Sequence, residues 1–138
     1  DRALTLRATI YRIFAAAAHR QVPAVADIFT LNAVLAQAPA RLRVLATGEK
    51  FEWQWLQNMD ALDGMLWPIA WSAADLLTSA NLARVRQCAR SEGCDWLFVD
   101  TSKNGSRRWC SMNLCGSRDK GRRFYRRKRA NEGKRLKV

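Results

Sequence analysis

Hydrophobic positions near the start of the chain follow the period of an α-helix. Within 3–19 they recur every three or four residues, which predicts an amphipathic helix. A second helix is predicted after Pro23, a residue suited to a first helical turn, and Pro39 marks its end. The side chains expected on the buried faces of these two helices are Leu6, Ile10, Ile13, Phe14, Ala17, Val25, Ile28, Leu31, Val34 and Leu35.

Alternation of apolar and polar residues replaces the helical period near 41–57. Two alternating runs flank the turn signal Thr47-Gly48, so we predict a β-hairpin. The return strand carries three aromatic residues on one face. They are Phe51, Trp53 and Trp55. We expect this ladder to pack against helices; a stacking platform for bases or the wall of a small-molecule site is the alternative.

A third helix is predicted over 60–78, from apolar residues at helical spacing. Pro68 lies inside this range and has no backbone N–H, so we expect a kink or a break there. Trp67 and Trp71 flank this point and, with two tryptophans of the hairpin, are candidates for lining a ligand pocket; filling the core is the competing interpretation. The candidate pocket residues are Trp53, Trp55, Trp67 and Trp71. A short strand is predicted over 82–87.

Four cysteines form two close pairs in the second half of the chain. Cys88, Cys94, Cys110 and Cys115 are separated by five, fifteen and four residues. Pairs at a hairpin-length separation can place four thiolates around one tetrahedral ion. We predict one structural Zn²⁺, because a closed Cys₄ shell leaves no open position for hydrolytic chemistry. Two disulfides, which need an oxidising compartment, are the alternative.

The spacer between the two cysteine pairs has a hairpin pattern of its own. Residues 96–100 alternate, Asn104-Gly105 is a two-residue turn signal, and 107–109 would return the chain to the third cysteine. We therefore expect 96–100 to pair with 107–109.

Positive charge is concentrated in the last part of the chain. The net charge is +12, and residues 88–138 hold fifteen Lys or Arg against five Asp or Glu. We predict a basic helix over 118–130, frayed at its distal end until a polyanion orders it, and nucleic acid as the partner. A solvated charged tail is the plainer alternative. The candidate nucleic-acid contacts are Lys103, Arg107, Arg108, Arg118, Lys120, Arg122, Arg123, Arg126 and Arg127.

The sequence around the cysteines resembles the zinc finger of the CGNR family. The matching features are Cys88, Cys94, the strand Trp96–Asp100, the turn Ser102–Gly105, the run Ser106–Met112, the signature Cys115-Gly116-Ser117-Arg118, and Lys120. Residues 1–82 resemble, in pattern and element order, the ABATE domain that usually precedes this finger. The resemblance implies a stress-related bacterial transcription regulator with a DNA-binding finger. Ser117 replaces the signature asparagine, and we expect it to cap the start of the helix.

These features together predict an α+β protein. A mainly helical domain over 1–81 carries the hairpin near 41–57, a treble-clef-like zinc finger with its basic helix covers 82–130, and 131–138 form a disordered basic tail. The resemblance implies a DNA-binding transcription regulator, which we expect to be cytoplasmic and nucleoid-associated. No apolar run approaches the roughly 18 residues of a membrane span.

Two other functions remain open from the sequence. Binding to RNA is one, because aromatic residues lie among the arginines and can stack on unpaired bases. These aromatic residues are Trp96, Trp109, Phe124 and Tyr125. We expect the two tryptophans to pack inside the finger instead. A ligand-sensing or protein-interaction module, with a homodimer or a small-molecule effector, is the other. We expect no enzyme, because the sole histidine, His19, is isolated.

Overall fold

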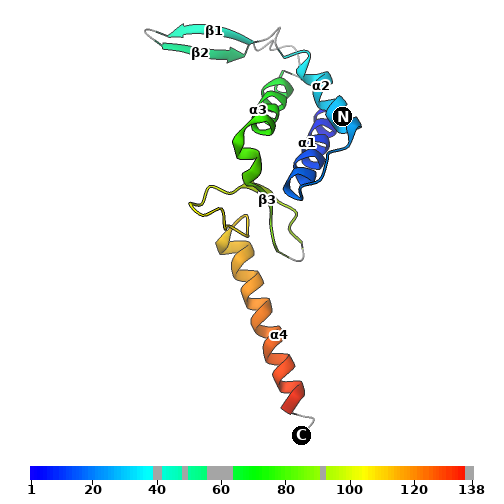
Figure 1. Ribbon diagram of the computed structural model, residues 1–138, viewed down its shortest axis with the longest axis vertical. Helices are drawn as coiled ribbons and strands as arrows, with labels where there is room; N and C mark the ends of the chain where they lie inside the picture. Colours follow the sequence, from blue (N-terminus) through cyan, green and yellow to red (C-terminus); the bar gives the residue numbers. More distant parts are fainter. Residues whose placement is uncertain (39–41, 48–49, 56–63, 91–92, 136–138) are drawn as a thin grey trace. The chain divides into compact units, whose positions relative to one another are not determined.

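The computed structural model describes residues 1–38, 42–47, 50–55, 64–90 and 93–135. The chain forms two compact units, Asp1–Ala83 and Arg84–Val138. The regular elements of the described residues are helices (Figure 1) and two small antiparallel sheets, which confirms the predicted α+β fold. Within these ranges no helix has the length and hydropathy needed to cross a bilayer.

Three helices form the core of the first unit: α1 (Arg2–Ala18), α2 (Val25–Leu35) and α3 (Leu66–Thr78). The buried residues at their contact are Leu6, Ile13, Leu31, Leu66 and Ala70. The hydrophobic period therefore located the first two helices and their inward faces, with one exception. Val25 is 83% exposed, because it is the first residue of α2 and the inward face begins one turn later.

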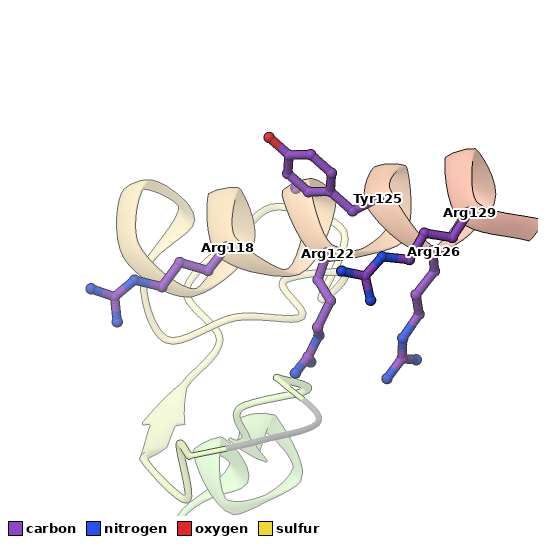
Figure 2. Close-up of a pocket in the computed structure, with 6 residues that line it drawn as sticks. Arg118, Arg122, Tyr125, Arg126 and Arg129 are labelled. Atoms are coloured by element: carbon purple, nitrogen blue, oxygen red, sulfur yellow. The ribbon is translucent and has the colours of Figure 1, made fainter. Parts of the chain in front are cut away.

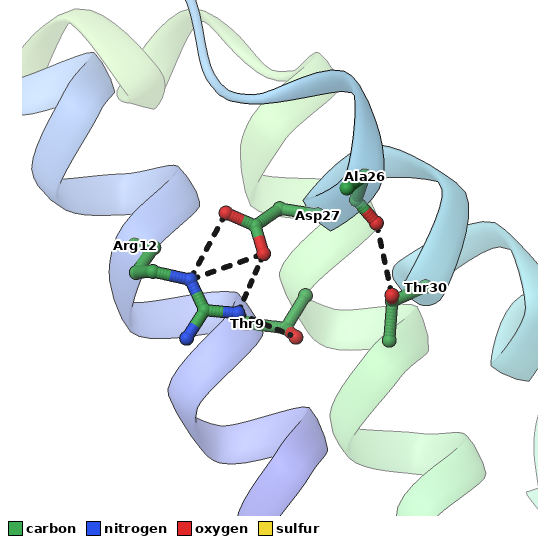
Figure 3. Close-up of polar contacts among 5 residues, drawn as sticks. All are labelled: Thr9, Arg12, Ala26, Asp27 and Thr30. Atoms are coloured by element: carbon green, nitrogen blue, oxygen red, sulfur yellow. Dashed lines mark hydrogen bonds and ion pairs between the residues drawn. The ribbon is translucent and has the colours of Figure 1, made fainter.

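An ion pair links α1 to α2 (Figure 3). Asp27 is buried, and Arg12 donates to both of its oxygens, with Nη2 at 2.6 Å from Oδ1 and Nε at 3.1 Å from each oxygen. Arg12 Nη2 also donates to Thr9 Oγ1 at 3.3 Å. The hydrogen bonds from Arg12 hold the pKa of Asp27 below its ordinary value. The pair therefore connects the two helices by charge as well as by packing.

The predicted hairpin is confirmed as β1 (Leu42–Thr47) paired antiparallel with β2 (Lys50–Trp55). The turn signal at Gly48 lies outside the described residues. Its aromatic ladder differs from the expectation. Phe51 and Trp53 are 77% and 71% exposed, and Trp55 contacts Trp71 edge-to-face, with ring centroids 6.0 Å apart.

The exposure of this ladder follows from the length of a strand. Successive residues on one face of a strand are about 6.6 Å apart, so Trp53 and Phe51 lie progressively further than Trp55 from the contact with α3. Packing of the ladder against helices is thus wrong for Phe51 and Trp53 and holds only at Trp55.

The start of α3 decides the effect of Pro68. α3 begins at Leu66, so Pro68 lies in the first turn, where a backbone N–H has no intrahelical partner in any case. The kink or break expected at this proline is therefore wrong; residues 60–63 of the predicted helix lie outside the described ones. The competing interpretation, that both tryptophans fill the core, is confirmed for Trp67, which is buried, and wrong for Trp71, which is exposed.

The second unit begins with a small two-stranded sheet. β3 (Val85–Gln87) follows a 3₁₀ turn at Ala80–Arg84 and pairs antiparallel with β4 (Leu97–Val99). The expected strand thus starts at Val85 rather than at 82. β4 was expected to pair with 107–109, and this is wrong, because its partner is the strand that leads into the first cysteine.

The turn signal after β4 is nevertheless a real turn. Gly105 has a positive φ of 60°, which glycine adopts without strain. Its N–H donates to the carbonyl of Ser102 at 3.3 Å. The turn therefore redirects the chain toward the third cysteine without forming a second strand pair there.

A long helix completes the second unit. A π-helical turn (Met112–Gly116) leads into α4 (Ser117–Arg135), drawn from orange to red in Figure 1. The helical backbone thus continues past the predicted end at 130 into the segment expected as a disordered tail, and 136–138 lie outside the described residues.

The cap of this helical segment is Ser111. Its Oγ accepts a hydrogen bond from the N–H of Leu114 at 3.3 Å. Ser117 was expected in this role, but its backbone is helical and its hydroxyl donates to the carbonyl of Met112 at 3.2 Å. The capping role of Ser117 is therefore wrong, because the helical segment begins about one turn earlier.

Candidate metal centre and basic helix

Four thiols come together in the second unit. The Sγ atoms of Cys88, Cys94, Cys110 and Cys115 all lie within 4.8 Å of one another. The separation is 3.7 Å between Cys94 and Cys110 and 3.6 Å between Cys110 and Cys115. A disulfide would bring two sulfurs to about 2.05 Å, so these are free thiols gathered around one point.

This arrangement fits one structural zinc ion. With Zn–S bonds of about 2.3 Å, the edges of a thiolate tetrahedron are about 3.8 Å long, close to both separations above. Burial and the neighbouring thiols raise the pKa of Cys110 to about 12. Four thiolates therefore need a cation to share this space. A closed shell of four sulfurs leaves no position for a reactive water.

The first cysteine pair is held by the small sheet. Cys88 directly follows β3, and Cys94 lies in the connection to β4. The N–H of Cys88 donates to the carbonyl of Trp96 at 2.9 Å, and the N–H of Ala89 donates to the carbonyl of Arg108 at 2.8 Å. The second of these bonds joins the first pair to the segment that carries the third cysteine.

Asp100 organises the turn after β4. Its side chain is fully buried, and Oδ1 accepts from the N–H and the hydroxyl of Ser102 at 2.9 and 2.6 Å. Oδ2 accepts from the N–H of Arg107 at 2.9 Å. The hydrogen bonds from Ser102, helped by that from Arg107, hold the pKa of Asp100 below its ordinary value.

Sequence reasoning missed the role of Asp100. The alternating pattern identifies Asp100 only as the last residue of a predicted strand. An aspartate two residues before Ser102 is also the signature of a turn in which the carboxylate accepts from the backbone ahead of it. That signal could have identified Asp100 as the start of the turn.

Arg107 connects this turn to the third cysteine. Its guanidinium donates to the carbonyl of Trp109 at 2.9 Å and to the carbonyl of Cys110. It also lies over the ring of Phe98, 4.7 Å from the centroid. Part of its donor capacity is therefore used within the unit. The guanidinium of Arg108 lies 5.2 Å from the centroid of the Trp109 ring.

The signature glycine allows close packing next to the last cysteine. A Cβ at Gly116 would lie 2.6 Å from Met112 Sδ and 3.4 Å from the ring of Trp109. Trp109 thus packs inside the unit, as expected. Trp96 does not: its side chain is 69% exposed, because it precedes β4 and its backbone carbonyl, rather than its ring, joins the contacts of the sheet.

The exposed surface of α4 is strongly cationic. Asp119 is the one acidic residue within 117–129, and it is buried. Its carboxylate lies 3.7 Å from Arg122 and 3.0 Å from Arg123. The exposed basic residues of this segment are Arg118, Lys120, Arg123, Arg126, Arg127, Lys128 and Arg129, and elsewhere in the unit Lys103, Arg107 and Arg108 are exposed. Of the nucleic-acid contacts predicted from the sequence, Arg122 is half-buried and the others are exposed; their contact with nucleic acid remains a prediction.

An open cavity of about 610 Å³ runs along α4 (Figure 2). Its lining residues are Arg118, Gly121, Arg122, Tyr125, Arg126 and Arg129. Figure 2 shows that Arg122 and Arg126 leave the helix on the same side and that the side chain of Arg129 runs back along it. The cavity is thus bordered by cationic groups and one aromatic ring.

The four candidate tryptophans of the first unit do not gather around one space. Trp53 borders a small cavity of about 180 Å³ on the hairpin, with Val44, Phe51 and Glu52. Trp67 is buried in the helical core, and Trp55 and Trp71 contact each other. A ligand site shared by all four stays a prediction that this geometry does not favour.

Two protein families match the sequence. Residues 84–128 match the CGNR zinc finger, and residues 1–80 match the ABATE family, described as "putative stress-induced transcription regulator". Both resemblances seen in the sequence are confirmed. No curated protein matches the chain.

Proposed function

This chain belongs to the ABATE family and carries a CGNR zinc finger, and on that premise we propose that it is a transcription regulator that binds duplex DNA through α4. The observation that supports this most directly is the helix itself. α4 follows directly after a centre that fits zinc, and it exposes basic side chains from Arg118 to Arg129.

Within 117–129, the carboxylate of Asp119 offsets only one of eight positive charges. Here the carboxylate is buried and lies against Arg122 and Arg123. The exposed basic residues of this segment are in contact with solvent, where their guanidinium and ammonium groups can neutralise phosphates and release condensed counterions. Arginine outnumbers lysine on α4, and its planar fork suits bidentate contacts to phosphate and guanine.

The zinc centre gives this cationic surface a defined starting point. Cys115 lies within the π-helical turn, Cys110 lies two residues before it, and Ser111 caps the turn. When bound, zinc supplies the cross-link that joins this turn to the β3–β4 connection. Contacts within the chain also hold the turn in place. The guanidinium of Arg107 donates to the carbonyl of Cys110, and the absence of a side chain at Gly116 allows Trp109 to pack against the turn. We propose no catalytic role for this centre.

RNA is the second candidate, and a specific observation favours it. Trp96 is exposed, and so are Phe124 and Tyr125, whose rings contact each other edge-to-face at 5.7 Å. Exposed rings beside arginines can stack on unpaired bases. Duplex DNA is our first choice, because a single helix with phosphate-binding groups on several sides suits a groove bordered by two backbones.

The experiment compares two double variants that lose the same charge. Arg118→Gln/Arg126→Gln removes two cations from α4 and leaves the partners of Asp119 in place. Arg7→Gln/Arg43→Gln removes two exposed cations from the first unit. Affinity for a labelled duplex and for a single-stranded RNA is measured by fluorescence anisotropy at several salt concentrations.

Contacts to about six phosphates give a slope of log K against log salt near −5, and loss of two contacts reduces its magnitude by about 2. We expect this change in the α4 variant and not in the control. Equal affinity of both variants and the wild type would remove the proposed function, and a preference for the single-stranded RNA would support the second candidate instead.

A further inference from the structure

Gly121 is one of the residues that line the cationic cavity of α4, and no contact in the described part of the chain requires a glycine there. Its backbone is helical, and the positive φ values among the described glycines belong to Gly93 and Gly105. A Cβ built at Gly121 meets nothing within 4 Å. Gly116, five residues earlier, is the opposite case, since a Cβ there would meet Met112.

The glycine weakens the helix that carries it. Glycine is among the poorest residues for a helix interior, because the unfolded chain loses more conformational freedom there than with any other residue. α4 also has basic residues at helical spacing, for example Arg118, Arg122 and Arg126, and like charges at this spacing repel. A residue that lowers the stability of such a helix, without a packing reason inside the molecule, points to a reason outside it.

The surroundings of Gly121 indicate what approaches it. Arg118 and Tyr125 lie three residues before and four residues after it, which places them above and below it on the same helical face. The other side chains of the cavity are arginines as well. A missing side chain leaves the helix backbone open between cationic donors and a phenol, and glycine is the residue that lets another backbone approach closely.

We infer that Gly121 is the floor of a binding site for the sugar–phosphate backbone of the nucleic acid. The phosphodiester lies over the glycine, Arg118 and Arg122 donate to its oxygens, and Tyr125 contacts the adjoining sugar. This inference rests on the proposed function, and it adds that the helix gives up stability at one residue so that the partner can come close.

The test uses one substitution at two positions of the same helix. Gly121→Ala and Gly133→Ala both replace glycine by alanine in α4, and twelve residues of helix place them about 18 Å apart. Gly121→Leu provides a larger side chain at the first position. Helix content is measured by circular dichroism and affinity for a labelled duplex by anisotropy, on the full chain loaded with zinc.

An added methyl group can change DNA affinity in two opposite directions. It raises affinity where it only stabilises the helix, and it lowers affinity where it occupies the space of the bound backbone. Both alanine variants should gain helix content. Gly133→Ala should bind as tightly as the wild type or more tightly, because its helix is better ordered before binding. Gly121→Ala should bind at least about tenfold more weakly, the effect of one lost charge-assisted hydrogen bond, and Gly121→Leu should bind more weakly still.

The outcomes separate this inference from the function on which it rests. If the wild type binds duplex DNA and Gly121→Ala binds as tightly as Gly133→Ala, the site over Gly121 is refuted and the proposed function stands. If the wild type itself binds no duplex, the proposed function fails and takes the inference with it.

Discussion

Removal of zinc is expected to unfold the second unit and to leave the first unit folded. The two units differ in what holds them together. Among the described residues of the second unit, the cysteines aside, Val85 is the one apolar residue that is buried. The first unit has a helical core, whose buried residues are Leu6, Ile13, Leu31, Leu66 and Ala70.

The free energies contributed by apolar burial and by zinc binding decide whether the second unit stays folded without the metal. Burial of a valine side chain contributes about 2 kcal/mol, whereas structural zinc contributes on the order of 10 kcal/mol or more in units of this size. A single buried valine cannot replace the metal, so the β3–β4 sheet and the turn at Ser111 should lose their structure when zinc is removed. The helical core contains no zinc ligand and should not respond.

Hydrogen exchange followed by mass spectrometry measures both units in one sample. The amide protons of Cys88, Ala89 and Cys115 donate to backbone carbonyls of the second unit, so they report on its folded state. After chelation, with metal loss verified by elemental analysis, these segments should exchange at the rate of an unfolded chain while α1 and α3 keep their protection. Addition of zinc should restore protection. Unchanged protection of the cysteine segments in metal-free protein would refute the reasoning.

Three further predictions concern single residues. Gly116→Ala should destabilise the second unit by about 1–3 kcal/mol, the usual cost of overpacking, as measured by thermal unfolding. The same substitution at Gly121, where a Cβ meets nothing within 4 Å, should not destabilise it. Equal melting temperatures of the two variants would contradict the packing argument. The two carboxylate oxygens of Asp100 together accept three hydrogen bonds, and Asp100→Asn replaces one of these oxygens by an NH₂ donor. Zinc affinity, measured by competition with a chelating dye, should fall about 10–100-fold. Wild-type affinity would show that the turn does not position the third cysteine. Because the pKa of Asp27 is lower in the folded state, its stabilising effect is complete above the ordinary aspartate pKa of about 4 and is lost as pH falls through the folded value. Asp27→Asn should therefore flatten the acid side of the stability profile from denaturant unfolding, and a variant profile parallel to that of the wild type would be inconsistent with the pair to Arg12.

Sequence patterns predicted the elements whose formation depends on residues close together in the chain. Apolar residues at helical spacing located α1 and α2, and two alternating runs located the β1–β2 hairpin. The spacing of the cysteines predicted a cluster because each pair is close in sequence and the spacer is long enough to turn back. Zinc chemistry does not depend on the details of the fold between the pairs.

The pairing of β4 could not be read from alternation alone. Alternation shows that 97–99 form a strand, but it does not identify the partner strand, and Asn104-Gly105 suggested the wrong one. The chain turns there, yet the carboxylate of Asp100 holds the N–H of Arg107, which would otherwise be available to a strand pair. The true partner, Val85–Gln87, lies on the other side of the first two cysteines.

The sequence pattern also did not predict which aromatic side chains are exposed. An aromatic face on a strand has the same sequence pattern whether a helix covers it or not, and Phe51 and Trp53 lie beyond the reach of α3. The same holds for Trp96, whose backbone carbonyl accepts from the N–H of Cys88 next to the sheet while its ring is exposed. The helix cap was misplaced for a related reason, because Ser111 and Ser117 both precede helical residues and only the backbone conformation distinguishes them.

One measurement tests the central claim most directly: the affinity of the full chain for a labelled DNA duplex, with zinc bound, after zinc removal and after zinc is restored. If the metal centre holds the turn from which α4 starts, affinity should fall at least about tenfold on removal, the effect of one or more lost charge-assisted contacts, and return with the metal. Affinity that does not change with zinc content would contradict the account, because the charge of α4 would then act without the centre that precedes it.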